Sequence, residues 1–143
     1  METTEKTRIS VQAKINAPIE AVWKYWTSPE DIVKWNNASD AWHTPYAEND
    51  LRNGGKFRSR MEARDGSSGF DFEGEYKNII DRELIEYTIA DGRIVKVVFS
   101  AEGRKTKIIE TFEAENTNPI EMQRAGWQSI LDNFKRYAEA KHQ

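Results

Sequence analysis

The 143-residue sequence contains no cysteine. This absence excludes disulfide bonds, thiol catalysis and thiolate metal sites. Two histidines without any cysteine also make a zinc site improbable. No nucleophile elbow, phosphate loop or dinucleotide fingerprint is present. We therefore expect neither a metal nor an organic cofactor.

The sequence also lacks long apolar runs and any strong excess of one charge. No run approaches the ~20 apolar residues that a membrane span requires, and the N-terminal METTEKTRIS has no signal-peptide core. The formal net charge is −3, and no dense Lys/Arg run occurs, which argues against a nucleic-acid partner. We expect a cytoplasmic protein with no membrane span and no nucleic-acid partner.

Aromatic residues are abundant, at 11% of the chain with five Trp. Such wide, flat side chains fill a large core or line a cavity. The length corresponds to one domain. We find no linker or internal repeat, so we predict a single domain over residues 1–143, with a frayed segment over 1–6.

Period-two alternation of apolar and polar residues predicts strands in several segments. Gly-rich and Asp-rich turns separate them, as at Asp65-Gly66-Ser67-Ser68-Gly69 and Asp91-Gly92. The predicted strands cover about 9–15, 41–47, 57–64, 70–77, 84–90, 94–100 and 106–113. Short turns between consecutive strands imply an antiparallel meander.

Helical spacing of apolar residues appears in three places. Two short helices follow the first strand, one over about 19–26 and one that begins near Pro29 after the cap residue Ser28. A long helix over about 119–141 ends the chain. The expected class is therefore α+β, with a curved antiparallel sheet of six to seven strands wrapped around this helix. One helix is too narrow to fill a broad curved sheet, so a cavity should remain between them.

Several motifs, taken in order, make a known family recognisable. They are the segments Ala17-Pro18-Ile19-Glu20-Ala21-Val22-Trp23, Trp26-Thr27, Pro29-Glu30, Gly54-Gly55-Lys56-Phe57, Phe72-Glu73-Gly74-Glu75-Tyr76 and Gly126-Trp127 with Leu131 and Phe134. The sequence resembles the helix-grip fold of the START-like superfamily, which includes pollen-allergen relatives and polyketide cyclases. More narrowly, it resembles bacterial homologues of the activator of heat-shock-protein-90 ATPase. The resemblance spans about residues 9–137. It implies the fold and leaves the activity open, because superfamily members bind lipids, hormones or polyketides, act as cyclases or serve as co-chaperones.

The stretch WNNASDAWHTPYAEND, residues 35–50, is dense in polar and aromatic side chains. The resemblance places it at the mouth of the cavity. If the strand alternates strictly, Trp42, Thr44 and Tyr46 share one face and His43 faces the other way. Trp35, Trp42 and Tyr46 are then either pocket walls or ordinary core, and His43 is either a polar anchor or an exposed residue.

Glu110 lies in the strand Thr106-Lys107-Ile108-Ile109-Glu110-Thr111-Phe112. With Phe112 facing the cavity, Glu110 faces it too, and its pKa rises enough for it to anchor a ligand or act as an acid or base. In the rival register Ile109 faces inward and Glu110 lies in water. Both faces hold apolar residues, so both registers remain open.

These observations give one leading hypothesis and two alternatives. The leading hypothesis is a START-like protein, monomeric or homodimeric, that binds a small hydrophobic or aromatic molecule. We expect the ligand-binding residues to be Trp35, Trp42, His43, Tyr46, Phe57, Met61, Phe72, Tyr76, Glu110 and Trp127. The alternatives are a co-chaperone that stimulates a chaperone ATPase, and a cyclase- or hydrolase-like enzyme that uses Glu110 or His43.

Overall fold

The computed structural model describes residues 7–37 and 39–142. The predicted frayed segment over 1–6 lies outside the described residues. The elements follow in the order β1 (Arg8–Ile15), α1 (Ile19–Thr27), α2 (Pro29–Trp35), β2 (Trp42–Asn49), β3 (Lys56–Ala63), β4 (Gly69–Ile80), β5 (Leu84–Ile89), β6 (Ile94–Glu102), β7 (Lys105–Glu113) and α3 (Ile120–His142). The predicted order of strand, two short helices, six strands and a long helix is confirmed.

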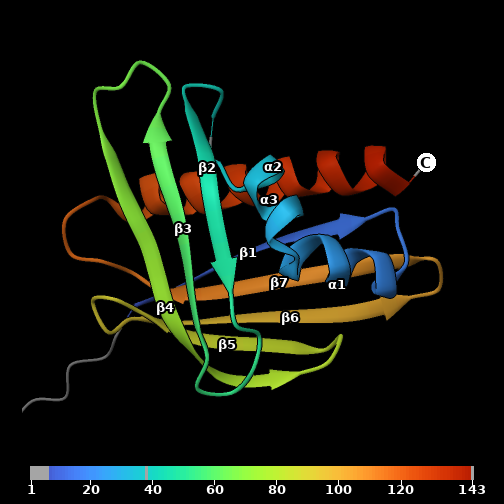
Figure 1. Ribbon diagram of the computed structural model, residues 1–143. Coiled ribbons are helices and arrows are strands. Elements are labelled where there is room, and N and C mark those ends of the chain that lie inside the picture. The colour runs from blue at the N-terminus through green and yellow to red at the C-terminus, as the bar shows by residue number, and fades with distance from the viewer. Residues whose placement is uncertain (1–6, 38, 143) are drawn as a thin grey trace, which may run out of the picture.

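All seven strands form one antiparallel sheet in the order β1-β7-β6-β5-β4-β3-β2. The sheet curls strongly, so that β2 and β3 cross the direction of β5, β6 and β7 at a steep angle (Figure 1). The sheet changes direction along strand β4, whose register with β5 shifts between Tyr76 and Asn78. A bulge of this kind bends the strand and increases its twist.

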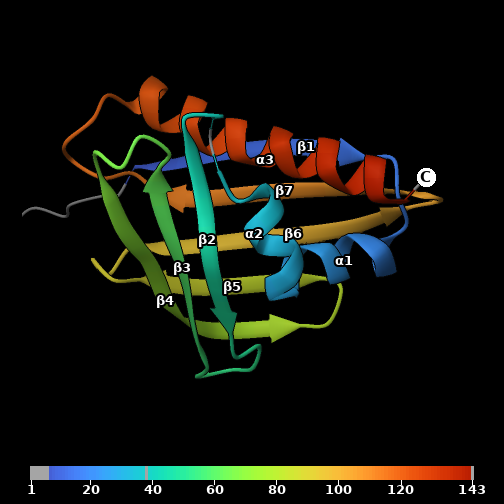
Figure 2. The ribbon, with the colours of Figure 1, turned by 45° about the horizontal axis from the view of Figure 1, so that its top comes forward.

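Helix α3 lies across the concave side of the sheet and packs mainly against β1 (Figure 2). Leu131, Phe134 and Ala138 on α3 are fully buried. They meet a core to which β1 and β7 contribute Ile9, Ile15, Ile108 and Phe112, all at most 1% exposed. Among the described residues, no helix combines the length and apolar character needed to cross a bilayer.

The two short helices cover one end of the curled sheet. The ring of Trp26 on α1 lies 4.9 Å from that of Trp35 on α2 and 4.8 Å from that of Phe134 on α3. The Trp35 indole N–H donates to the Tyr25 carbonyl at 2.9 Å. These aromatic contacts fix α1 and α2 against α3, as edge-to-face ring pairs do in cores.

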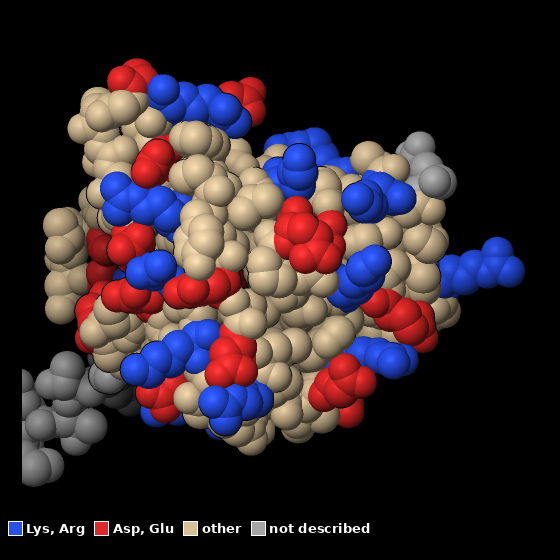
Figure 3. Space-filling view, in the orientation of Figure 1, with Lys and Arg blue, Asp and Glu red and all other residues tan. Residues whose placement is uncertain are grey.

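Charged side chains occupy the outer face of β2, β3 and β4. Arg60 on β3 pairs with Asp71 on β4 at 3.5 Å. Arg58 pairs with Glu48 on β2 at 3.4 Å. Basic and acidic groups are interspersed over the face in Figure 3, with no large area of one sign. Exposed pairs of this kind contribute about 0–1 kcal/mol each.

Candidate functional site

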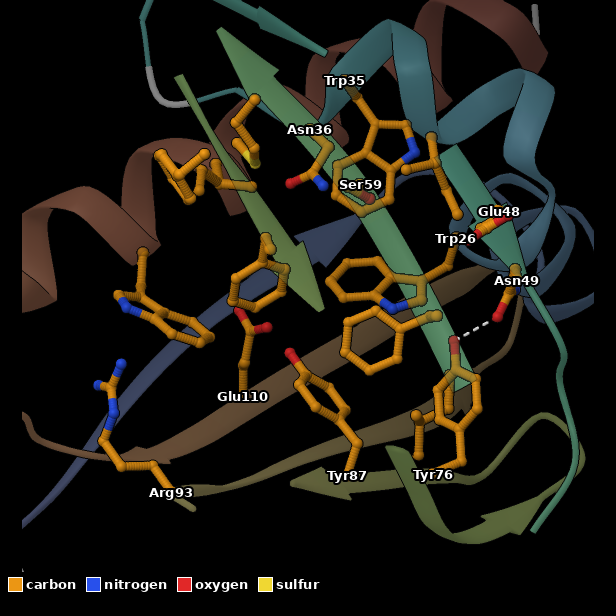
Figure 4. A pocket seen from close by; sticks show the side chains of 18 residues that line it. Trp26, Trp35, Asn36, Glu48, Asn49, Ser59, Tyr76, Tyr87, Arg93 and Glu110 are labelled. Carbon is orange, nitrogen blue, oxygen red and sulfur yellow. Dashed lines mark hydrogen bonds between the residues drawn. The ribbon is translucent and has the colours of Figure 1, made fainter. Parts of the chain in front are cut away.

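A cavity of about 270 Å³ lies between the concave face of the sheet and helix α3. Strands β2, β3, β4, β5 and β7 line it, together with all three helices (Figure 4). The lining is mainly aromatic and aliphatic. The helix therefore leaves part of the curled sheet unfilled, as its width predicts.

The apolar wall consists of rings that contact one another. The ring of Phe57 lies 5.8 Å from Phe72, 5.1 Å from Tyr76 and 4.9 Å from Tyr87. On the helix side, Trp127 stacks on Phe112 at 3.9 Å with an interplanar angle of 11°. Rings locked in this way form a preformed surface for an apolar guest.

Glu110 faces the cavity and is only 6% exposed. Its neighbours on the same face, Ile108 and Phe112, are buried as well. The structure therefore selects the inward register, and Ile109 lies on the outer side. Burial raises the pKa of Glu110 from 4.5 to about 8, because desolvation penalises the charged carboxylate. Near pH 7 this side chain is mostly a neutral acid.

Two more polar groups, Tyr87 and Arg93, line the same cavity as Glu110 (Figure 4). The hydroxyl of Tyr87 on β5 points toward the carboxyl group of Glu110. Burial, together with the charge of Glu110, raises the pKa of Tyr87 well above its usual value. Arg93, just before β6, donates from Nε to Asp91 at 2.8 Å and from a terminal nitrogen to the Glu113 carbonyl at 3.1 Å.

A separate polar link closes the cavity near β2. The Tyr76 hydroxyl donates to the side-chain oxygen of Asn49 at 2.5 Å. The side-chain nitrogen of Asn49 donates to the Thr27 carbonyl at the end of α1, also at 2.5 Å. This chain of bonds ties β4, β2 and α1 together on one side of the cavity.

Most of the sequence-predicted binding residues line this cavity. They are Trp35, Phe57, Met61, Phe72, Tyr76, Glu110 and Trp127. The other three, Trp42, His43 and Tyr46, lie on the first part of β2 and are not among the lining residues.

The predicted common face for Trp42, Thr44 and Tyr46 is wrong for Tyr46. A bulge shifts the register of β2 between His43 and Tyr46. Thr44 is buried, whereas Tyr46 is 46% exposed and its hydroxyl donates to Glu48 at 2.6 Å. Pro45 lies at the bulge, and a residue without an N–H is confined to such sites and to edge strands.

His43 and Trp42 also lie away from the cavity interior. The His43 imidazole lies 3.8 Å from the carboxylate of Glu62, which is a partly exposed residue of β3. The ring of Trp42 contacts Phe70 at 5.9 Å, and Phe70 is itself a lining residue. Trp42 therefore contacts a residue of the cavity wall without lining the cavity itself.

Sequence reasoning missed several lining residues. Trp26, Asn49, Tyr87 and Arg93 line the cavity but were not predicted to do so. Tyr87 had a usable signal, because it alternates with the apolar residues Ile85 and Ile89 of its strand. Arg93 follows a turn, and nothing in its local sequence indicates that its side chain lines the cavity.

The curled antiparallel sheet, the long C-terminal helix and the cavity between them together define a START-like, helix-grip protein. A family model described as "Activator of Hsp90 ATPase homolog 1-like protein" matches residues 16–139. The chain therefore belongs to this family. A comparison with curated protein sequences gives no match.

Solved structures support the same assignment. An AHSA1-like protein from Aeromonas hydrophila is 46% identical, with 94% of each chain covered and a TM-score of 0.89. A protein from Cytophaga hutchinsonii is 51% identical, with 94% of this chain and 93% of that chain covered and a TM-score of 0.81. A protein from Nitrosomonas europaea shares the fold at 16% identity, with 94% and 95% covered and a TM-score of 0.80.

Proposed function

We propose that this protein binds a small hydrophobic or aromatic molecule in the cavity between the sheet and α3. The observation that carries the proposal is the cavity of about 270 Å³, whose lining is dominated by aromatic rings. Ligand pockets usually measure about 300–1,000 Å³. The cavity lies just below this range, so the ligand is small, with one or two rings.

The polar lining gives such a ligand an orientation. Glu110 is buried at one end of the cavity and serves as a polar anchor. Of the two residues expected to serve the enzyme alternative, only Glu110 lines the cavity, because His43 pairs with Glu62 outside it. With His43 outside the cavity, the site suits binding better than acid–base chemistry.

Filling the cavity tests the proposal. Ser59 points into the cavity from β3 and is buried, so the Ser59→Phe side chain would occupy the ligand volume. Ser100 on β6 is exposed, and Ser100→Phe is the matched control. We expect the neutral fluorescent probe N-phenyl-1-naphthylamine to bind the wild type and Ser100→Phe equally. Its affinity for Ser59→Phe should fall at least tenfold.

Native mass spectrometry of the purified protein provides a second readout. A co-purified small molecule that is present in the wild type and lost in Ser59→Phe supports the proposal. Equal probe binding by Ser59→Phe and Ser100→Phe would show that the cavity is not the binding site.

The family description favours one second candidate, a protein-interaction role as an activator of a chaperone ATPase. Stimulation of the ATPase of a heat-shock-protein-90 chaperone by the purified chain would support it. The Ser59→Phe variant separates the two roles, because a filled interior leaves the outer surface unchanged. An ATPase rate that does not change with added protein rules this candidate out.

A further inference from the structure

The polar end of the cavity is built from strands on either side of β6. Glu110 on β7 pairs with Val97 of β6, and Tyr87 on β5 pairs with Val95 of β6. The backbones of β5 and β7 are thus two strand spacings apart, roughly 10 Å. Between them β6 presents only short valine side chains. The longer side chains of Glu110 and Tyr87 therefore extend over the valines toward the same space (Figure 4).

Both groups hold a proton near pH 7. The pKa of Glu110 is raised to about 8 by burial, and the pKa of Tyr87 is raised well above 10. A neutral carboxylic acid and a phenol each have one O–H to donate. Among the described residues, none forms a hydrogen bond with the Glu110 carboxyl group. Its O–H is therefore available to a guest.

Arg93 adds a paired positive charge to the lining of the cavity. Its guanidinium group lines the same cavity and is held by Asp91 and by the Glu113 carbonyl. Its charge partly offsets the rise that burial causes in the pKa of the Tyr87 phenol, but Asp91 pairs with it at 2.8 Å, so it disfavours a cationic guest only weakly. It favours a guest with a partial negative charge on oxygen.

We propose that this end of the cavity binds a hydrogen-bond-accepting oxygen, such as the carbonyl of an aryl ketone, with Glu110 and Tyr87 as the two donors. One carbonyl oxygen has two lone pairs and accepts both bonds. The inference rests on the proposed function, since the rings of the cavity must first hold the apolar part of the ligand. It adds the chemical class of the ligand's polar group.

The proposal requires a pH dependence of definite sign. Glu110 must be protonated to donate, so affinity for a ketone is constant below about pH 8 and falls above it. The titratable or charged groups at this end are Tyr87 from β5, Tyr76 from β4, whose ring lies 6.3 Å from that of Tyr87, and Arg93 from the turn before β6. Helix α3 contributes Trp127 and Ile130, neither of which titrates, and Glu48 lies on the far side of the cavity (Figure 4). An amine would need ionised Glu110, so its affinity would rise over the same pH range.

Three naphthalene compounds of nearly equal shape test the inference. They are 2-acetylnaphthalene, 2-isopropenylnaphthalene, in which a methylene group replaces the carbonyl oxygen, and 1-(2-naphthyl)ethylamine. Their dissociation constants are measured by NMR titration between pH 6 and pH 10. At pH 7 we expect the ketone to bind about tenfold more tightly than the alkene, because two net hydrogen bonds are gained. Above pH 8 the ketone's advantage should shrink to about threefold, the contribution of the Tyr87 bond, because Tyr87 keeps its proton. The alkene should show no such change.

Two substitutions assign the effect to the named residues. Glu110→Gln retains an N–H donor but cannot titrate, so the ketone preference should persist without the pH dependence. Tyr87→Phe should reduce the preference about threefold, to the contribution of one bond. Circular dichroism checks that each variant is folded, and the wild-type pH profile needs no variant.

The outcomes separate this inference from the proposed function. If neither the ketone nor the alkene binds, the proposed function fails and this inference fails with it. If both bind equally and shift the resonances of cavity residues, the cavity binds apolar molecules and only the choice of an acceptor oxygen is wrong. Tighter binding of the amine as the pH rises would also overturn it.

Discussion

At the scale of single residues, Glu110 combines a potential function with a cost in stability. Its carboxyl group has an ordinary pKa of 4.5 and a folded-state pKa of about 8. Between these values the folded protein binds more protons than the unfolded chain. The free energy of unfolding therefore decreases as the pH rises from about 4.5 to about 8, and it becomes level above this range.

Glu110→Gln should remove this dependence. Glutamine is neutral at all pH values and has nearly the same shape. At pH 5 we expect the variant and the wild type to have similar stability. At pH 8.5 the variant should be more stable by roughly 2–5 kcal/mol, because the folded wild type then holds a buried charge. Urea denaturation at pH 5, 7 and 8.5 measures the difference.

Glu102→Gln is the control for this prediction. Glu102 is exposed, and its pKa is lowered by the hydrogen bond and charge of Lys14. A lowered pKa gives the opposite sign of pH dependence, with stability lost as the medium becomes acidic. Parallel stability curves for Glu110→Gln and the wild type would contradict a buried acid with a raised pKa.

The sequence indicated Glu110 as a candidate binding residue, but it could not show whether the side chain faces the cavity or the solvent. Ile108 and Phe112 make one face of β7 apolar, and Ile109 contributes to the other. A strand with apolar residues on both faces does not determine its register. The electrostatic interaction between Glu110 and Tyr87 joins strands β7 and β5, and only the assembled sheet brings these two side chains together.

At the scale of elements, alternation and turn residues predicted all seven strands. They succeeded because most strands have one polar and one apolar face, and Gly and Asp mark the turns between them. Alternation failed in β2, where the bulge next to Pro45 moves Tyr46 to the outer face. The proline was the available signal, since it cannot donate a hydrogen bond to the neighbouring strand.

The loop between β7 and α3 depends on one buried side chain, Gln123. Its side-chain oxygen accepts from the Glu115 amide at 2.9 Å. Its nitrogen donates to the carbonyls of Glu115 and Asn118 at 3.2 and 2.7 Å. Gln123→Leu leaves these backbone groups without partners, so we expect a loss of about 1–3 kcal/mol. Amide exchange at Glu115 should accelerate as well.

Gln128→Leu on the same helix provides the comparison. Gln128 donates to the Gln12 carbonyl at 3.1 Å, and that bond is exposed to water. Its loss should cost less than about 1 kcal/mol, because water replaces the lost partner. Equal costs for the two substitutions would show that Gln123 does not hold the loop.

At the scale of the whole molecule, folding and ligand binding use the same interior. The sheet curls at β4, α3 covers part of the concave face, and the rest of the interior forms the cavity. The width of a helix predicted a space there, but not its size. That size depends on how the rings of Phe57, Phe72 and Trp127 pack, which no local sequence pattern determines.

Trp127 joins the two parts of this interior, because it stacks on Phe112 of the core and also lines the cavity. Trp127→Ala should therefore lose about 3 kcal/mol of stability, and the space left should merge with the cavity. Indole fits such a space, and at ten times its dissociation constant it should restore about 1.4 kcal/mol. Trp42→Ala removes a ring outside the cavity lining, so indole should stabilise that variant no more than it stabilises the wild type. Thermal unfolding with and without indole measures both effects, and equal rescue of the two variants would mean that Trp127 is not part of a ligand-accessible interior.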